Sequence, residues 1–138
     1  MVLNRIKQAI VNQIVILYPG ITIYDEDIPQ DFDTPSFLIT VIEQDYTKGI
    51  GNRYYSEVSF DLAYFSDQPT TDIKGDCLSV QQNILRSFDI VDRFRFFNKS
   101  ATITDNVLHF MFKVRYSEMK NEEEIKMKSM ISEVDVKE

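Results

Sequence analysis

Two strand-like runs separated by a short glycine-bearing segment constrain this chain more than any other feature. Residues 42–60, IEQDYTKGIGNRYYSEVSF, place glycines at positions 49 and 51 between these runs. In the second run Val58, Phe60 and Leu62 alternate with polar residues, which is the period-two pattern of a strand with one buried face. Glycine readily adopts the positive φ angles of tight turns. The sequence therefore predicts a long β-hairpin.

A second strand pair is predicted nearer the C-terminus. Residues 92–105, DRFRFFNKSATITD, lead through Asp105 and Asn106 into residues 107–117, VLHFMFKVRYS, where apolar residues again alternate with polar ones. Residues 37–44, FLITVIEQ, form a strong strand and residues 21–24, ITIY, a short one. Strands joined by hairpins make a largely antiparallel sheet.

Two amphipathic helices are available to cover that sheet. The first helix ends at Pro19-Gly20. Val2, Val11 and Val15 widen its apolar stripe. A wide stripe fits either a helix that contacts more than its own sheet or a helix that is deeply buried. The second follows the turn SDQPTTD, where Thr70 or Thr71 can cap its first amides. The predicted buried residues are Leu3, Ile6, Ile10, Ile14 and Leu17 in the first helix, and Ile73, Cys77, Leu78, Ile84, Leu85 and Phe88 in the second.

The predicted fold class is α+β, a mostly antiparallel β-sheet covered on one face by two α-helices, with a long β-hairpin and a C-terminal tail. We expect one domain over residues 1–118. Residues 119–138 form a charged C-terminal extension whose i,i+4 pairs, such as Glu122 with Lys126, favour a helix that is stable only when docked.

Arg5 and Lys7 precede an apolar run as in a secretory signal, but Asn12 and Gln13 interrupt that run, so we expect a folded helix. No run reaches the ~20 apolar residues of a membrane span.

Composition restricts the function classes. The formal net charge of −7 disfavours a broad nucleic-acid-binding surface, which requires clustered Lys and Arg. Cys77 is the only cysteine, so no intrachain disulfide or cysteine-based zinc site can form, and a reducing cytoplasm is the simplest setting. His109 is the only histidine and has no recognisable partner, which indicates a surface or interface residue rather than a general base. Cys77 is most simply a small core residue.

No motif for catalysis or cofactor binding is found, so we predict no enzyme, no catalytic residue, no cofactor and no metal. The acids of YDEDIPQDFD lack the glycine and glutamate positions of a calcium loop, which favours a solvated acidic loop over a metal site. A basic set could form a patch if the last strands pair, although an ordinary charged sheet face is favoured. The acids are Asp25, Glu26, Asp27, Asp31 and Asp33, and the bases are Arg93, Arg95, Lys99, Lys113 and Arg115.

The hairpin tip is the candidate partner-binding site. The segment KGIGNR contains G-x-G but opens no helix, so it fails the test for a nucleotide-binding loop. It is either a mobile contact tip or a plain hairpin turn, and the residues alone do not decide between these. The candidate contacts are Lys48, Gly49, Ile50, Gly51, Asn52 and Arg53.

The order of these elements resembles the tail terminator proteins of long-tailed bacteriophages and of prophages in Gram-positive hosts. The pieces that carry the resemblance are TPSFLI at 34–39, FDLAYF at 60–65, LSVQQNIL at 78–85 and LHFMFKVRY at 108–116. The resemblance implies a structural minor tail protein, a homohexameric ring in the assembled tail and possibly a monomer in isolation. By this resemblance, the ring is expected to cap the tail tube, end its polymerisation and join the head. Its expected partners are itself, the tail tube protein and the head-completion or connector protein, with no membrane and no specific nucleic acid.

The resemblance also implies assembly in the host cytoplasm and a place at the head-proximal end of the virion tail, with the hairpin tip contacting a partner. Two other functions stay open: a head-completion or connector adaptor, and, in a different class, a cytosolic α+β ligand-binding or enzyme domain. The charged extension after residue 118 departs from the commoner pattern of the family. Whether the tail is contractile is not decided by the sequence.

Overall fold

The computed structural model describes residues 2–119, which form two helices and one six-stranded sheet. The predicted conditional helix of the extension lies outside the described residues. None of the helices in residues 2–119 is both long and apolar enough to cross a membrane. The elements in chain order are α1 (Val2–Leu17), β1 (Thr22–Asp25), β2 (Ser36–Lys48), β3 (Arg53–Phe65), α2 (Ile73–Ser87), β4 (Ile90–Val91), β5 (Phe94–Thr104) and β6 (Val107–Met119).

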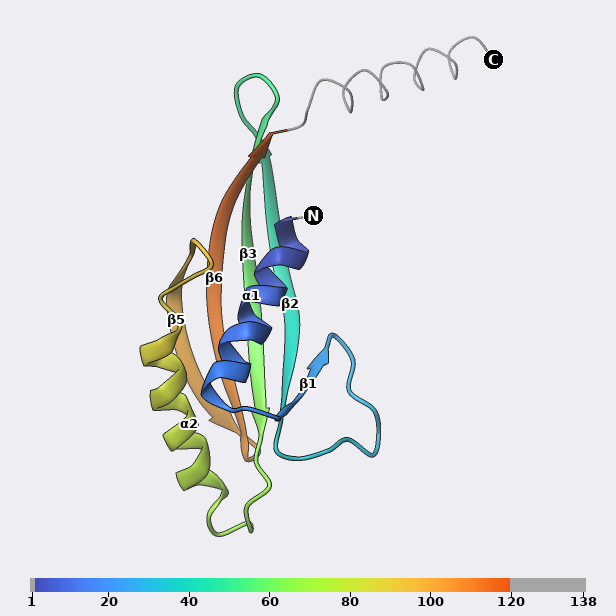
Figure 1. The fold of residues 1–138 in the computed structure, drawn as a ribbon, viewed down its shortest axis with the longest axis vertical. Helices are drawn as coiled ribbons and strands as arrows, with labels where there is room; N and C mark the ends of the chain where they lie inside the picture. Colours follow the sequence, from blue (N-terminus) through green and yellow to red (C-terminus); the bar gives the residue numbers. More distant parts are fainter. Residues whose placement is uncertain (1, 120–138) are drawn as a thin grey trace, which may run out of the picture.

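The strand order in the sheet is β1-β2-β3-β6-β5-β4, and only the β1–β2 pair is parallel. Both helices lie on the same face of the sheet, α1 across the strands β2 and β3 and α2 beside β5 and β6 (Figure 1). The opposite face is covered by no element among the described residues. The predicted α+β class, with an antiparallel sheet covered on one face, is confirmed.

The long hairpin is confirmed as β2 and β3, which pair from Ser36 with Phe65 to Lys48 with Tyr54. A bulge interrupts the register between Val41 and Glu43, and Ile42 in the bulge is exposed. A bulge bends the strand and increases its twist. Beyond it, every residue of β2 up to Lys48 is exposed, so this half of the strand extends past the core.

Helix α1 buries Ile6, Ile10 and Ile14 completely, as its periodicity predicts. The stripe is narrower at the C-terminal end than the sequence suggests, because Val15 is 43% exposed and Ile16 is 71% exposed. A deeply buried helix is therefore ruled out. After the helix, Gly20 adopts a φ of 81°, which lets the chain turn into β1.

Helix α2 differs from its prediction in two respects. Its N-cap is Asp72 rather than Thr70 or Thr71, and the cap makes no side-chain hydrogen bond. The Asp72 N–H donates to the Pro69 carbonyl at 2.8 Å and closes the turn before the helix. Leu78 is 45% exposed, whereas Val80 takes the buried place in the stripe. Residues 77, 80 and 84 are spaced by three and four, so they share one face, while residue 78 turns away from the sheet.

The core lies between the helices and the sheet and is rich in aromatic rings. Phe88, at the C-cap of α2, is fully buried, and its ring centroid lies 5.4 Å from that of Phe96 and 5.9 Å from that of Phe110. At the start of α2, Asp76 accepts hydrogen bonds from the hydroxyls of Tyr64 and Ser66. Burial, with the nearby Asp76 charge, raises the pKa of Tyr64, so this phenol stays protonated and keeps donating.

Candidate functional site

The half of the sheet that extends past the helices is here called the arm: residues 42–57 of the β2–β3 hairpin and residues 115–119 of β6. Figure 1 shows it projecting as a narrow ribbon beyond α1 and α2. Strand β3 forms its centre, paired with β2 on one side and with β6 on the other out to Arg53 and Met119. A three-stranded ribbon is stiffer than an isolated hairpin, which is marginally stable in water.

The tip of the arm contains all six predicted contact residues. Strand β2 ends at Lys48 and β3 begins at Arg53, so the residues between them form the turn. The Gly49 N–H donates to the Arg53 carbonyl at 2.8 Å and closes it. Ile50 stands at its end with 97% of its surface exposed. The structure thus brings the six residues together at one projecting point, while their role as contacts stays a prediction.

The two glycines of the tip serve different purposes. Gly51 has a φ of 70°, the left-handed conformation that turn glycines are expected to supply. Gly49 does not: a Cβ at this position would collide with the ring of Tyr55. Gly49 therefore allows Tyr55 to pack over the turn, a reason that no local sequence pattern could reveal.

Polar and aromatic side chains, rather than a hydrophobic core, hold the arm together. The side-chain amide of Gln44 donates to the Ser56 hydroxyl at 3.0 Å and to the Tyr116 hydroxyl at 3.1 Å, which links all three strands. Ser56 is 5% exposed, and its hydroxyl donates to the Asp45 carbonyl at 3.1 Å. The rings of Tyr46 and Tyr54 stack with centroids 5.4 Å apart.

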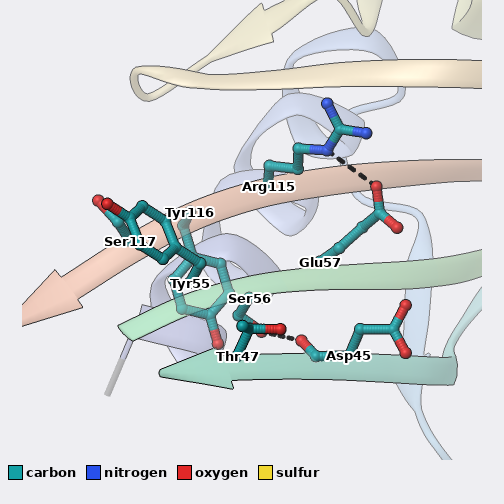
Figure 2. A pocket seen from close by; sticks show the side chains of 8 residues that line it. All are labelled: Asp45, Thr47, Tyr55, Ser56, Glu57, Arg115, Tyr116 and Ser117. Atoms are coloured by element: carbon teal, nitrogen blue, oxygen red, sulfur yellow. Dashed lines mark hydrogen bonds and ion pairs between the residues drawn. The ribbon is translucent and has the colours of Figure 1, made fainter. Parts of the chain in front are cut away.

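A shallow groove of about 540 Å³ runs along the arm (Figure 2). Within it the Arg115 Nε donates to the Glu57 carboxylate at 2.9 Å, and the same guanidinium lies 4.5 Å from the ring centroid of Phe97. The groove is open and the Arg115 side chain is 73% exposed, so the groove fits a surface that another protein covers better than an enclosed ligand pocket. Its lining residues are Asp45, Thr47, Tyr55, Ser56, Glu57, Arg115, Tyr116 and Ser117.

His109 has a partner that sequence reasoning missed. Its Nδ1 lies 3.0 Å from the Asp61 carboxylate, across the β3–β6 ladder on the uncovered face. The expectation that His109 is a surface residue holds, since 35% of its side chain is exposed, but the expectation that it has no partner is wrong. The two residues are 48 positions apart, and only the strand register shows that they meet. No hydrogen bond among residues 2–119 joins this pair to a hydroxyl or thiol nucleophile.

Cys77 is fully buried in the core cluster, as predicted. Burial, together with the neighbouring Asp76 charge, raises the pKa of its thiol. A thiol held in its neutral form is a poor nucleophile and a poor metal ligand, because the thiolate is the reactive species. Cys77 therefore contributes to packing.

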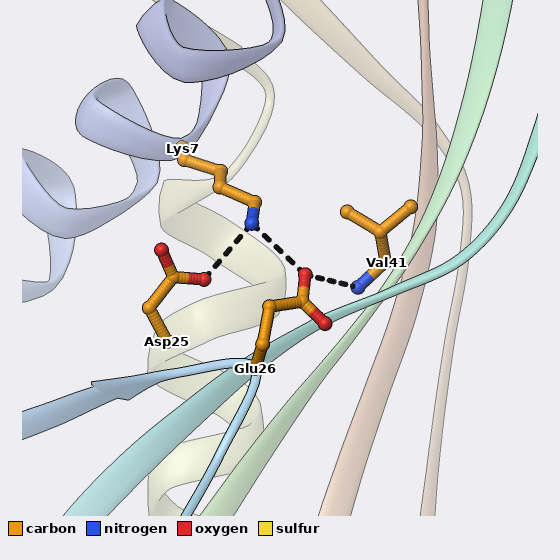
Figure 3. Close-up of polar contacts among 4 residues, drawn as sticks. All are labelled: Lys7, Asp25, Glu26 and Val41. Carbon is orange, nitrogen blue, oxygen red and sulfur yellow. Dashed lines mark hydrogen bonds and ion pairs between the residues drawn. The ribbon is translucent and has the colours of Figure 1, made fainter.

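The acidic loop contains a structural ion pair. Lys7 of α1 lies 2.9 Å from both the Asp25 and the Glu26 carboxylates, and Glu26 also accepts a hydrogen bond from the Val41 N–H at 3.2 Å (Figure 3). Partial burial lowers the pKa of Lys7, but the hydrogen bonds to Glu26 and Asp25 outweigh it and raise that pKa. Among residues 2–119 no three His, Cys, Asp or Glu side chains gather as a metal site would require.

The last strands do pair, but the basic set is divided among different surroundings. Arg115 is engaged with Glu57 and Phe97, and the Lys99 ammonium donates to the Phe88 carbonyl at 3.0 Å on the helix side of the sheet. Arg93 lies in the turn before β5 with a φ of 71°. Arg95, Lys113 and Arg115 lie on the uncovered face around Phe97, so three of the five bases share one surface. The structure does not bring the five bases into one patch.

The geometry describes a structural module: a sheet with one free face, a projecting arm and an exposed apolar tip. Comparison with known families gives the same class, since residues 5–126 match the model of a family described as phage tail terminator protein. The match extends into the predicted C-terminal extension. No curated protein matches the chain. Because the family model spans most of its length, the chain belongs to the phage tail terminator proteins.

Proposed function

We propose that this chain acts as a homohexameric ring that caps the tail tube, ends its polymerisation and provides the surface to which the head joins. Assembly takes place in the host cytoplasm, and the ring then occupies the head-proximal end of the virion tail. Family membership supports the terminator role over that of a head-completion adaptor or of an α+β enzyme. The ring, the capping and the head-joining surface are inferred from what the resemblance implies.

The observation that carries the proposal is the arm with its exposed tip. Ile50 is 97% exposed at the end of a ribbon whose three strands are linked by the side-chain hydrogen bonds of Gln44. Burying an isoleucine side chain at an interface contributes roughly 1.5–3 kcal/mol. One such contact is weak, but six copies in a ring engage a tube end multivalently, which multiplies the apparent affinity. Lys48 and Arg53 flank Ile50 and supply polar contacts around it.

The charge of the chain fits a ring through which DNA passes. Each subunit carries a formal net charge of −7, so a wall built from such subunits repels the phosphate backbone rather than binding it. The ring would therefore let DNA pass without retaining it.

The test is electron microscopy of tubes assembled from the cognate tail tube subunits in the presence of this protein. We expect the wild-type protein to cap tubes and limit their length, and the variant Ile50→Asp with Arg53→Asp to leave tubes of uncontrolled length. The matched control is Ile16→Asp on α1, because Ile16 is also a highly exposed isoleucine, at 71%, but lies far from the arm in the sequence. Normal length control by the tip variant would contradict the role of the arm, and an effect of both variants would show that the loss is not specific to the tip.

A further inference from the structure

Part of the uncovered face carries three bases around one aromatic ring. They are here called the basic surface, which consists of Arg95, Phe97, Lys113 and Arg115. Phe97 of β5 and Lys113 of β6 are direct partners in the strand ladder, and the Arg115 guanidinium lies 4.5 Å from the Phe97 ring centroid. Arg95, Phe97 and Arg115 line a hollow of about 310 Å³. The basic surface thus combines positive charge with an open concave shape.

The basic surface has more positive than negative charge around it. Arg115 donates to the Glu57 carboxylate (Figure 2), and Asp61, the other acid of β3 on this face, is engaged by His109. Within residues 2–119 neither Arg95 nor Lys113 forms an ion pair. Because like charges close together repel each other, carboxylates that bind between these bases stabilise the surface.

The size of the basic surface suits a short acidic segment rather than a long polyanion. On its β3 side the surface is bordered by Glu57 and Asp61, and across the sheet by the exposed acids Glu43 and Asp45 of β2. Nucleic acid laid across this face would meet a row of acids that repel its phosphates. The basic surface can therefore bind a few carboxylates, but it does not continue into a wider basic patch.

The chain itself carries such a segment directly after β6. Strand β6 ends at Met119, and the first acids that follow are Glu122, Glu123 and Glu124. The match to the tail terminator family extends to residue 126, so these glutamates belong to the matched region rather than to a tail beyond it. Three consecutive carboxylates match the three bases in number and in sign.

The length of the chain allows this contact within one copy. Arg115 lies four residues before Met119 in β6, which is about 13 Å at a strand rise of about 3.3 Å per residue. Arg95 is level with Arg115 in the β5–β6 ladder. Glu124 follows Met119 by five residues, and five residues span at most about 18 Å. The glutamates can therefore reach the basic surface of their own chain.

We propose that the basic surface binds Glu122–Glu124 of the same chain, with their carboxylates between the three bases. The chain then turns back over the uncovered face immediately after β6. Ile125 follows the glutamates and comes to lie beside Phe97 and Met111, of which Met111 is 36% exposed. The contact covers the face that the helices leave open, at the place where the arm begins. It belongs to the single chain and does not rest on the proposed function.

The direct test is cross-linking with a water-soluble carbodiimide. This reagent joins a lysine amine to a carboxylate in contact with it as an amide and takes up the released water as a urea. The variant Arg95→Lys keeps the positive charge and places a second reactive amine in the basic surface. We expect peptide mapping by mass spectrometry to find amide bonds from position 95 and from Lys113 to Glu122–Glu124.

Lys48 is the internal control, because it lies closer than Lys113 to the end of β6. Lys48 and Met119 pair with the neighbouring β3 residues Tyr54 and Arg53, so about two strand spacings, roughly 10 Å, separate them. Lys113 lies six residues before Met119, which is about 20 Å. Glutamates without a binding site would therefore react more often with Lys48. A larger yield at Lys48, or no link to the basic surface, would overturn the proposal.

A mixture of unlabelled and ¹⁵N-labelled protein shows whether the contact is made within one copy. Links within one copy join two peptides of the same isotope, whereas links between copies also give mixed pairs. We expect only pairs of the same isotope. Mixed pairs would overturn the proposal and would identify this face as an interface between copies.

Charge reversal tests whether the bases are responsible for the contact. Arg95→Glu should lower the yield of the Lys113 link severalfold, because the surface loses a cation and gains an anion. The matched control is Arg86→Glu, the same change at an exposed residue of α2, which should leave the yield unchanged. An unchanged yield in Arg95→Glu would contradict the charge pairing. Circular dichroism of each variant shows that the fold is retained.

A gel-shift experiment with a DNA duplex examines the other class of polyanion. We expect no retarded band with the wild-type protein. A band that appears with the wild-type protein and disappears with Arg95→Glu would assign the basic surface to nucleic acid and overturn the proposal.

Discussion

The two ends of the same sheet are stabilised in different ways. At the covered end, β3 alternates between buried apolar residues and polar ones, and two helices lie over the buried face. In the arm the same strands continue without helices, and every β2 residue beyond the bulge is exposed. There a buried serine, an amide and stacked tyrosines replace the apolar core. The covered end thus sets the stability of the fold, whereas the arm presents a surface at little cost to that stability.

The largest effect is expected from truncating the covered end at Phe88. Phe88→Ala removes a fully buried ring that contacts Phe96, Phe110 and Phe112 and that joins the end of α2 to the sheet. A Phe→Ala change in a core costs about 3–5 kcal/mol in the free energy of unfolding. Urea denaturation followed by circular dichroism measures it. A loss below about 1 kcal/mol would mean that the covered end is not the stabilising half.

The next effect concerns Asp76, which ties the start of α2 to the end of β3. Asp76→Ala leaves the hydroxyl of Tyr64 buried without its acceptor at 2.7 Å, and the loss of a hydrogen bond to a charged group costs about 1.5–3 kcal/mol. The matched control is Asp67→Ala in the preceding loop, where the carboxylate is exposed and, within residues 2–119, accepts only from the neighbouring Gln68 side chain. The control should change the free energy of unfolding by less than about 0.5 kcal/mol.

The pH dependence of stability gives a second test of the contact between Asp76 and Tyr64. The pKa of Tyr64 is raised in the folded protein, first by burial and then by Asp76, so the folded state holds this proton more tightly than the unfolded state. The stability that this phenol contributes is thus fully present below the ordinary tyrosine pKa of 10.0 and is lost as the pH rises through the raised pKa of the folded state. Wild-type protein should lose stability above about pH 10, and Tyr64→Phe should lose less over the same range. Equal losses would contradict the link.

The sequence predicts the covered end well because each of its elements depends on local periodicity. The alternation of Val58, Phe60 and Leu62 and the helical spacing of Ile6, Ile10 and Ile14 both place the correct side chains in the core. The sequence prediction is wrong where contacts with neighbouring residues, rather than local periodicity, determine the structure. Leu78 fits the apolar stripe of α2 by composition but turns outward, and the N-cap falls on Asp72 because the Pro69 turn fixes where the helix begins.

The candidate site is predicted only in part. The sequence locates the tip and its six residues, since glycines between two strands indicate a turn. Long-range register determines the rest and is not encoded in any local pattern. The pairing of Asp61 with His109, the contact of Lys7 with Glu26 and the packing of Tyr55 over Gly49 all require the folded sheet.

The smallest effect is expected in the arm, and it should be local. Ser56→Ala removes the acceptor of Gln44 and the donor to the Asp45 carbonyl, which costs about 1 kcal/mol in the stability of the arm. Because regions with few buried apolar contacts open independently of the global unfolding, the loss should appear as faster hydrogen exchange at amides of residues 44–56, with exchange at Phe60 and Phe110 unchanged. Ser59→Ala, three positions along β3 on the uncovered face, is the matched control and should leave the arm amides unaffected. If Ser56→Ala accelerated exchange equally throughout the sheet, the two ends would form one cooperative unit, and the arm could not be altered without weakening the fold that carries it.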